Sequence, residues 1–379
     1  MPTTQKIQLS SGTLTVDVAR ADWKLDDLCA FAARDNPRRA FLVVSKVLGR
    51  HMPTKPSIMR ASFRDLAALI SPDLPGPVLV MGMAETAICL GQGVHEELVK
   101  QSGRSDMLYL HSTRQMLDHP ILCQFEEPHS HASSHIVYRP EELDAEFAAP
   151  RSLVIVDDEI STGTTIKNLA EAMITALPSI EHIVAVTLAD WSVGKDWHHH
   201  ISRPCDVVSL LSGQLEMTQL EMTSNIQTKP QTQAFDKAAT ALGGMAQHHN
   251  FGRLGRIDIA NEGDRLTEEL TLPAHDKILV LGTGEFTYPT FRIAEKLEAL
   301  GHDVVVQSTT RSPVQMGDVI RHKLSFADNY GTAVPNYVYN VDPSGERTVI
   351  ICHETPRGSV DPELVQLLDA QLLAFGEII

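Results

Sequence analysis

Apolar runs of strand length alternate with segments of helical periodicity through residues 1–213. Several of the runs are apolar without alternation, as in parallel strands that are buried on both faces. Between them the pattern predicts helices at 63–70, 86–101 and 165–176. This order predicts an α/β fold with a doubly wound parallel sheet flanked by helices. The predicted strands are 41–48, 77–83, 105–112, 151–158, 181–190 and 204–213.

The pattern changes at 214–250, which is polar and rich in Gln and Thr, apart from one helix candidate at 234–246. A second alternating unit follows, with predicted strands at 277–286, 302–310 and 347–354 and predicted helices at 287–301 and 366–375. We therefore expect a first domain at 1–213, a linker or arm at 214–250, and a second, smaller Rossmann-like α/β domain at 251–379.

Charge and composition exclude several classes of protein. The 379 residues include 32 Lys and Arg against 48 Asp and Glu, a net charge of −16, and no basic run marks a nucleic-acid-binding face. The sequence has no apolar run near the ~20 residues that span a bilayer, and its start lacks the apolar core of a signal peptide. Its five cysteines form no CxxC pair. We expect a cytoplasmic protein that binds neither nucleic acid nor a membrane.

The segment LVIVDDEISTGTTIKNLAEAM at 153–173 carries the clearest chemistry. A buried strand would fix Asp157 and Asp158 at its carboxyl end, where open α/β sheets bind ligands. Adjacent carboxylates accept hydrogen bonds from vicinal hydroxyls or hold Mg²⁺. The following loop presents hydroxyls and backbone N–H groups at a helix N-terminus, which favours a phosphate. A sugar phosphate fits this segment, whose loop residues are Ser161, Thr162, Gly163, Thr164 and Thr165.

VIVDDEISTGTT resembles the ribose-phosphate loop of type I phosphoribosyltransferases. The segments at 36–53, 81–94 and 125–140 resemble a bacterial subfamily from tellurite-resistance and stress-response gene clusters. Thr310-Arg311-Ser312-Pro313 is similar to the signature of the TRSP domain that accompanies this subfamily. Segments 282–289 and 320–341 resemble further parts of that domain, so the resemblance covers nearly the whole chain outside 214–250.

The resemblance implies transfer of ribose 5-phosphate from phosphoribosyl pyrophosphate (PRPP) to a nitrogenous acceptor, with Mg²⁺ and release of pyrophosphate. Asp157 and Asp158 would hold the ribose hydroxyls, directly or through Mg²⁺, and the loop would bind the 5′-phosphate. Purine-specific members usually carry Asp where this chain has Ser161, which makes a purine acceptor less expected. The turn after the 77–83 strand is the expected pyrophosphate site. Its candidate residues are Met83, Ala84, Glu85 and Thr86, with Lys46, Arg50 and His51 as cations.

Two further groups of residues complete the predicted transferase site. Arg114 and His131 are candidate catalytic residues, the first for phosphate contact and the second for the leaving group or acceptor. HSHASSH at 129–135 is interpreted as a lid, with His129, His135 and Arg139 near the acceptor. A plain surface loop and a transition-metal site remain alternatives for this segment.

The second domain has a candidate ligand site of its own. The GTG turn at 282–284 lacks the third glycine of a dinucleotide fingerprint, which argues against NAD. Hydroxyls and a guanidinium follow the 302–310 strand and suit an anion. We expect this domain to bind the product or to act on it in a second step. The candidate residues are Gly282, Gly284, Glu285, Tyr288, Thr310, Arg311 and Ser312.

Two other functions remain open beside transfer. The chain would instead cleave a nucleoside or nucleotide with phosphate or pyrophosphate, or bind PRPP only to regulate. By analogy with the fold, a homodimer is expected.

Overall fold

The computed structural model describes residues 3–34, 39–127, 134–145, 147–219, 251–255, 270, 272, 276–332 and 334–375. Its largest sheet has seven strands, and the five from β11 to β6 run parallel while β1 and β2 are antiparallel. The predicted α/β fold class is thus confirmed. The strand order is β1 (Thr3–Leu9), β2 (Gly12–Ala21), β11 (Cys205–Gln219), β10 (His182–Asp190), β9 (Ser152–Ile160), β5 (Val78–Gly82), β6 (Met107–His111).

The crossover connections of this sheet run in opposite directions from its centre. The chain passes from β5 through α3 (Ile88–Ser102) to β6, and from β9 through α4 (Thr164–Ala176) to β10 on the other side. Because such connections are right-handed, α3 and α4 cover opposite faces. The carboxyl ends of β5 and β9 therefore form a topological switch point, the place where open α/β sheets bind ligands.

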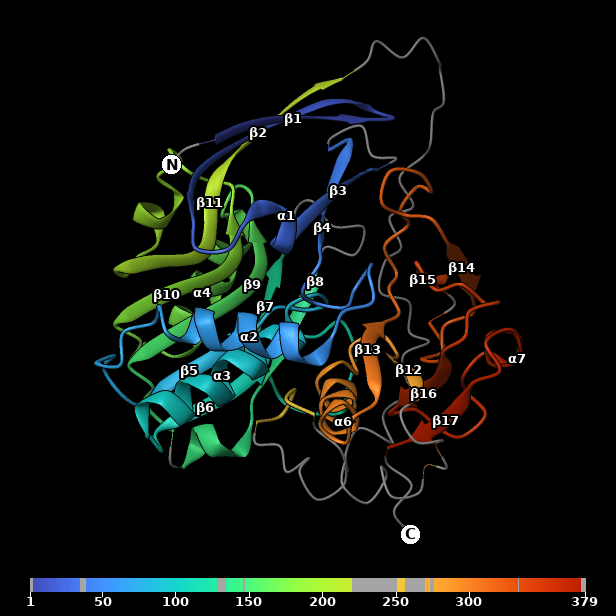
Figure 1. Ribbon diagram of the computed structural model, residues 1–379. Coiled ribbons are helices and arrows are strands. Elements are labelled where there is room, and N and C mark those ends of the chain that lie inside the picture. The colour runs from blue at the N-terminus through green and yellow to red at the C-terminus, as the bar shows by residue number, and fades with distance from the viewer. Residues whose placement is uncertain are drawn as a thin grey trace.

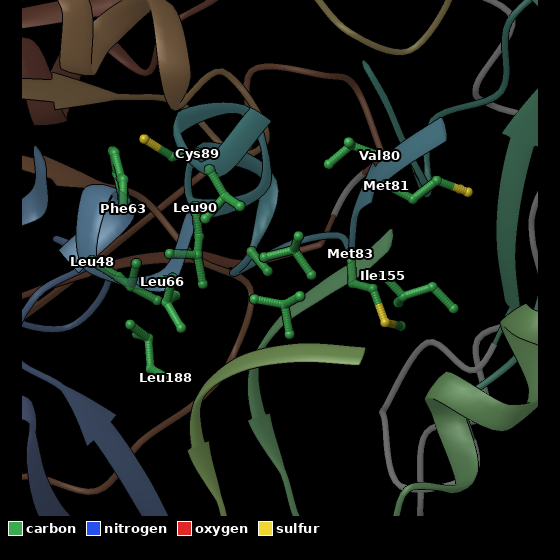
Figure 2. Packing of buried hydrophobic residues seen from close by; sticks show 14 of the residues in the cluster. Leu48, Phe63, Leu66, Val80, Met81, Met83, Cys89, Leu90, Ile155 and Leu188 are labelled. Atoms are coloured by element: carbon green, nitrogen blue, oxygen red, sulfur yellow. The ribbon is translucent and has the colours of Figure 1, made fainter. Parts of the chain in front are cut away.

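The core of the first domain lies between this sheet and the helices. α2 (Pro56–Ala67) lies beside α3 in front of the sheet in Figure 1. Val80, Met81 and Ile155 are fully buried in the strands, and Figure 2 shows Phe63 of α2 near Leu90 of α3 in the same cluster. The continuous apolar runs of β5 and β9 are explained by this burial on both faces.

Two short antiparallel pairs flank the sheet. β4 (Phe41–Ser45) pairs with β3 (Cys29–Ala33), near the short helix α1 (Leu25–Leu28), and β7 (Ile121–Glu126) pairs with β8 (Ser134–Tyr138). The strand predicted at 41–48 exists, but it lies outside the parallel sheet. Short 3₁₀ helices span Glu141–Asp144 and Trp197–His200. β11 runs to Gln219, past the domain boundary expected at 213.

The second domain is built on a parallel four-stranded sheet in the order β13 (Asp303–Ser308), β12 (Lys277–Gly282), β16 (Thr348–His353), β17 (Gln371–Ala374). α6 (Tyr288–Ala299) follows β12, and β14 (Lys323–Phe326) pairs with β15 (Asn336–Tyr339). The helix predicted at 366–375 is wrong. α7 (Pro362–Leu367) starts earlier because the Asp361 side chain caps it, and β17 follows Asp369, whose φ of 45° breaks the helix.

The two domains pack directly against each other. α6 lies beside α2 and α3 in Figure 1, and the Phe291 and Phe63 rings meet edge to face at 5.2 Å. Arg60 on α2 pairs with Glu295 on α6 through Nε and Oε1 at 2.7 Å. Buried Ala32 and Val44 of the β3–β4 pair pack with apolar residues of the second domain, including Val314, Ile320 and Tyr339. Among the residues that the structure describes, no helix is both long enough and apolar enough to cross a membrane.

Candidate active site

Two neighbouring strands bring the main predicted segments together at the switch point. β5 and β9 are parallel partners, and the backbone N–H of Met83, just after β5, donates to the carbonyl of Val156 at 3.0 Å. Asp157 and Asp158 are the next two residues of β9, directly after Val156. The turn expected to bind pyrophosphate and the two acids expected to hold the ribose therefore share one edge of the sheet.

The two acids form a half-buried pair. The Asp158 N–H donates to Asp157 Oδ1 at 2.9 Å. Burial raises the pKa of both carboxyl groups; the neighbouring Asp158 raises that of Asp157 further, and Glu159 adds to the rise at Asp158, to about 6. Adjacent carboxylates with destabilised negative charge are a donor set that suits a hard cation such as Mg²⁺. The described part of the chain has no group of three or more His, Cys, Asp or Glu arranged to hold a metal ion.

The loop after β9 leads into the N-terminus of α4. Gly163 has a φ of +75°, and a Cβ at this position would lie 2.0 Å from the Trp197 ring. The Thr162 hydroxyl donates to that of Thr164 at 3.1 Å, and Lys195 Nζ donates to the Ser161 carbonyl at 2.7 Å. Thr164 and Thr165 open the helix, so their backbone N–H groups point out of its first turn. This geometry suits an anion.

The turn after β5 is fixed by a chain of polar groups, of which Ser112 and His135 are buried. Its Ala84–Glu85 peptide bond is cis. The Ala84 N–H donates to Ser112 Oγ at 3.0 Å, Ser112 Oγ lies 3.2 Å from His135 Nδ1, and His135 Nε2 lies 3.0 Å from Glu127 Oε2. Burial lowers the pKa of His135, which favours a neutral ring. Arg114 Nη2 lies 3.1 Å from His135 Nε2 and donates to Glu127 Oε2 at 2.7 Å. His135 thus supports the turn from behind.

Three guanidinium groups surround the Glu85 carboxylate. Arg50 Nη2 donates to Glu85 Oε2, while Arg114 Nε and Arg311 Nε each lie 3.9 Å from Glu85 Oε1. Arg50 Nη1 also donates to the Gly284 carbonyl at 3.0 Å and to Ser308 Oγ at 3.1 Å. Burial lowers the pKa of Arg50, and the neighbouring acids counteract this. The cluster joins residues of both domains.

Comparison with known families agrees with this geometry. Residues 28–214 match the family model of a phosphoribosyl transferase, and residues 244–371 match that of the TRSP domain found C-terminal to this transferase. The chain belongs to this family of phosphoribosyl transferases.

Solved structures with a similar arrangement include several phosphoribosyltransferases. The APRTase of Giardia lamblia in complex with 9-deazaadenine is 16% identical, with a TM-score of 0.35 over 50% of this chain and 98% of that one. The adenine phosphoribosyltransferase of Rhodothermus marinus is 15% identical, with a TM-score of 0.32 over 49% and 95%. The orotate phosphoribosyltransferase of Aeropyrum pernix is 16% identical, with a TM-score of 0.27 over 46% and 79%. No curated protein sequence matches the chain.

Several predicted residues of this phosphoribosyl transferase lie away from the turn. Lys46 donates through Nζ to the Asp26 carbonyl, and half-buried Arg139 pairs with Asp144. The buried His51 ring lies 5.6 Å from the Tyr339 ring, and burial lowers its pKa to about 3. His135 lies buried in β8 rather than in a lid. His129 and His131 fall outside the described residues.

The candidate residues of the TRSP domain do not gather in one site. Gly284 and Arg311 reach the transferase turn, and Tyr288 donates from α6 to Glu96 on α3. Thr310 makes two backbone hydrogen bonds with Tyr337, and its Oγ1 accepts from the N–H of Ser312. Gly282 packs too closely for a side chain, since its Cβ would meet the Phe286 carbonyl oxygen at 2.4 Å.

Glu285 lies at the centre of the domain contact. It accepts from Thr113 Oγ1 at 2.5 Å, from the Arg114 N–H at 2.9 Å and from Arg253 Nη2 at 3.0 Å. Sequence reasoning missed Arg253, Ser112 and Glu127. They carry no motif, and only the meeting of distant segments reveals their roles.

Proposed function

We propose that this phosphoribosyl transferase moves ribose 5-phosphate from PRPP to a nitrogenous acceptor, with Mg²⁺ bound and pyrophosphate released. One observation carries the proposal: the acid pair and anion loop of β9–α4 lie beside the turn after β5, joined by the hydrogen bond from Met83 to Val156. A ribose held between them would have its 5′-phosphate at the loop and its pyrophosphate at the turn.

Each part has a defined task in this reaction. The backbone N–H groups at the start of α4 bind the 5′-phosphate and anchor the sugar. Asp157 and Asp158 accept hydrogen bonds from the ribose hydroxyls and hold Mg²⁺ directly or through water. The cation supplies charge neutralisation for the departing pyrophosphate. The fixed turn keeps the reacting carbon in position, which lowers the entropic cost of transfer.

The proposal extends to the product and its setting. We infer a nucleotide- or nucleoside-like product in a stress-response pathway, tellurite resistance included, and a homodimeric, cytoplasmic enzyme. Residues 1–213 would form the transferase domain and 251–379 the TRSP domain, joined through 214–250. The support is the resemblance of the sequence segments described above.

The first test is binding of PRPP with Mg²⁺ by titration calorimetry. We expect Asp158→Asn to weaken binding about 10–100-fold, because a carboxylate that holds the cation or the ribose is lost. Asp206→Asn is the matched control, since this exposed acid lies at the opposite end of the sheet, at the start of β11. Absence of PRPP binding by the unmodified protein would overturn the proposal.

Turnover separates the alternative functions. Pyrophosphate release with one of a panel of nitrogenous bases supports transfer. Ribose 1-phosphate formed from a nucleoside and phosphate would indicate phosphorolysis instead. Saturable PRPP binding without pyrophosphate release for any acceptor would indicate a regulator.

A further inference from the structure

The carboxyl edges of the two parallel sheets face each other. The segment after β12 contacts the segment after β6, where Glu285 accepts hydrogen bonds from Thr113 and Arg114. The end of β13 contacts the loop after β4, where the Ser308 N–H donates to the Gly49 carbonyl at 2.8 Å. Ligand sites in α/β sheets form at carboxyl edges, so two such edges meeting at one turn make a shared site possible.

Arg311 reaches this turn from a firmly held loop. Its neighbour Thr310 is fixed by two backbone hydrogen bonds to Tyr337 at 2.8 and 2.9 Å. The Arg311 side chain is 20% exposed, and its Nε lies 3.9 Å from Glu85 Oε1. This distance allows charge attraction but exceeds a hydrogen bond, so Glu85 leaves the donor capacity of Nε unused.

Arg114 also has a guanidinium N–H that the Glu85 carboxylate leaves unused. Its side chain is 8% exposed, and within the described structure its Nε is buried without a hydrogen-bond partner. This atom also lies 3.9 Å from Glu85 Oε1. A buried guanidinium N–H without an acceptor is costly, so an anion that accepted a hydrogen bond from this atom would be stabilised here.

Arg50 supplies the third guanidinium and is positioned by both domains. It is 4% exposed and bonded to Glu85 from the first domain, and to Gly284 and Ser308 from the second. The TRSP domain therefore contributes one cation directly and orients another.

We infer that Arg311 of the TRSP domain binds the pyrophosphate group of PRPP together with Arg50 and Arg114, so that the TRSP domain completes the transferase site. When no pyrophosphate is bound, Glu85 is the counter-anion bonded to Arg50 and lies 3.9 Å from the Nε atoms of Arg114 and Arg311, while Arg114 Nη2 is paired with Glu127. This inference rests on the proposed function. It assigns Arg311 to the transferase site instead of a separate site for a second step.

The test compares ligands with and without pyrophosphate on the full-length protein. In Arg311→Met, the Kd values for PRPP and for inorganic pyrophosphate, each with Mg²⁺, are expected to rise about 10–100-fold through loss of charge-assisted hydrogen bonds. The Kd for ribose 5-phosphate should change less than about twofold. Arg311→Lys should recover part of the affinity, because it restores the charge without the planar donors.

Arg321→Met is the matched control, because it removes the same charge from an exposed position of the same domain. Its affinities should equal those of the unmodified protein, and thermal unfolding should verify that all variants fold. Glu85→Gln should bind pyrophosphate more tightly, by about tenfold, because the competing carboxylate is gone.

The outcomes separate the two claims. If the unmodified protein binds PRPP and Arg311→Met binds it equally well, the inference is overturned and the proposed function stands. If PRPP is not bound but pyrophosphate is, and Arg311→Met loses it, the proposed function fails and the anion site remains. If neither ligand binds, or Arg311→Met loses ribose 5-phosphate equally, the inference is overturned.

Discussion

Replacing Arg253 with methionine is expected to lower the free energy of unfolding by about 3–5 kcal/mol. Arg253, Glu285 and Glu354 have side chains only 3%, 2% and 7% exposed. Arg253 Nη1 and Nη2 donate to the two Glu354 oxygens at 2.7 Å each, and Nη2 also donates to Glu285 at 3.0 Å. The variant would leave two carboxylates buried without this partner, which costs far more than loss of an exposed pair.

Urea denaturation followed by circular dichroism measures this loss. Arg151→Met is the control, because Arg151 and Glu181 form an ion pair with half-exposed side chains, and its removal should change stability little. A loss for Arg253→Met no larger than that of the control would contradict the role given to this cluster.

The same cluster predicts a pH dependence. Burial alone would raise the pKa of Glu285, but the attraction of Arg253 outweighs it, and the pKa is held at about 2 instead of the usual 4.5. A carboxyl group whose pKa is depressed in the folded protein stabilises the fold at pH values above its pKa in the unfolded chain. This contribution disappears as the pH falls from about 4.5 towards 2. The stability difference between the unmodified protein and Glu285→Gln should therefore shrink as the pH falls from about 4.5 to about 2. A difference that stays constant over this range would argue against a charged Glu285.

Gly163→Ala is expected to reduce kcat/KM for phosphoribosyl transfer by about 10²-fold or more while the protein remains folded. The added methyl group would lie 2.0 Å from the Trp197 ring, and the φ of +75° at position 163 strains any residue with a Cβ. The loop must therefore shift, and the N–H groups at the start of α4 would lose their alignment with the 5′-phosphate.

Gly103→Ala is a control that introduces backbone strain at a positive φ without a steric clash. Gly103 also has a positive φ, +67°, but a Cβ there would meet no atom within 4 Å. This control should keep its affinity for ribose 5-phosphate, whereas Gly163→Ala should lose it. Equal affinities in the two variants would mean that the loop does not bind the 5′-phosphate.

Local patterns predicted the β9–loop–α4 segment well. Its buried strand is a continuous apolar run, and its loop needs a glycine; α4 was predicted at 165–176 and spans Thr164–Ala176. The partner of β4 was not predictable in this way. Its apolar run is equally compatible with a central or a flanking strand, and the choice depends on packing against the second domain.

The cations at the turn show the same limit. Lys46 and Arg50 both follow β4, and the sequence offered no means to rank them. The loop docks on β13, where Gly49 has a φ of +63° and its Cβ would lie 2.6 Å from the Val306 carbonyl oxygen. This docking carries Arg50 to Glu85, while Lys46 donates to the Asp26 carbonyl. Arg114 and Arg311 likewise meet only because two sheets approach edge to edge.

The docking of this loop also protects an edge strand. β13 is the last strand of its sheet, and Thr54 exchanges two backbone hydrogen bonds with Val306, at 3.1 and 2.8 Å, along its outer side. Without the loop, these backbone groups would form an open edge, the kind of surface on which β-proteins pair with one another and aggregate. The first domain thus covers the edge strand of the second domain and lowers its tendency to aggregate.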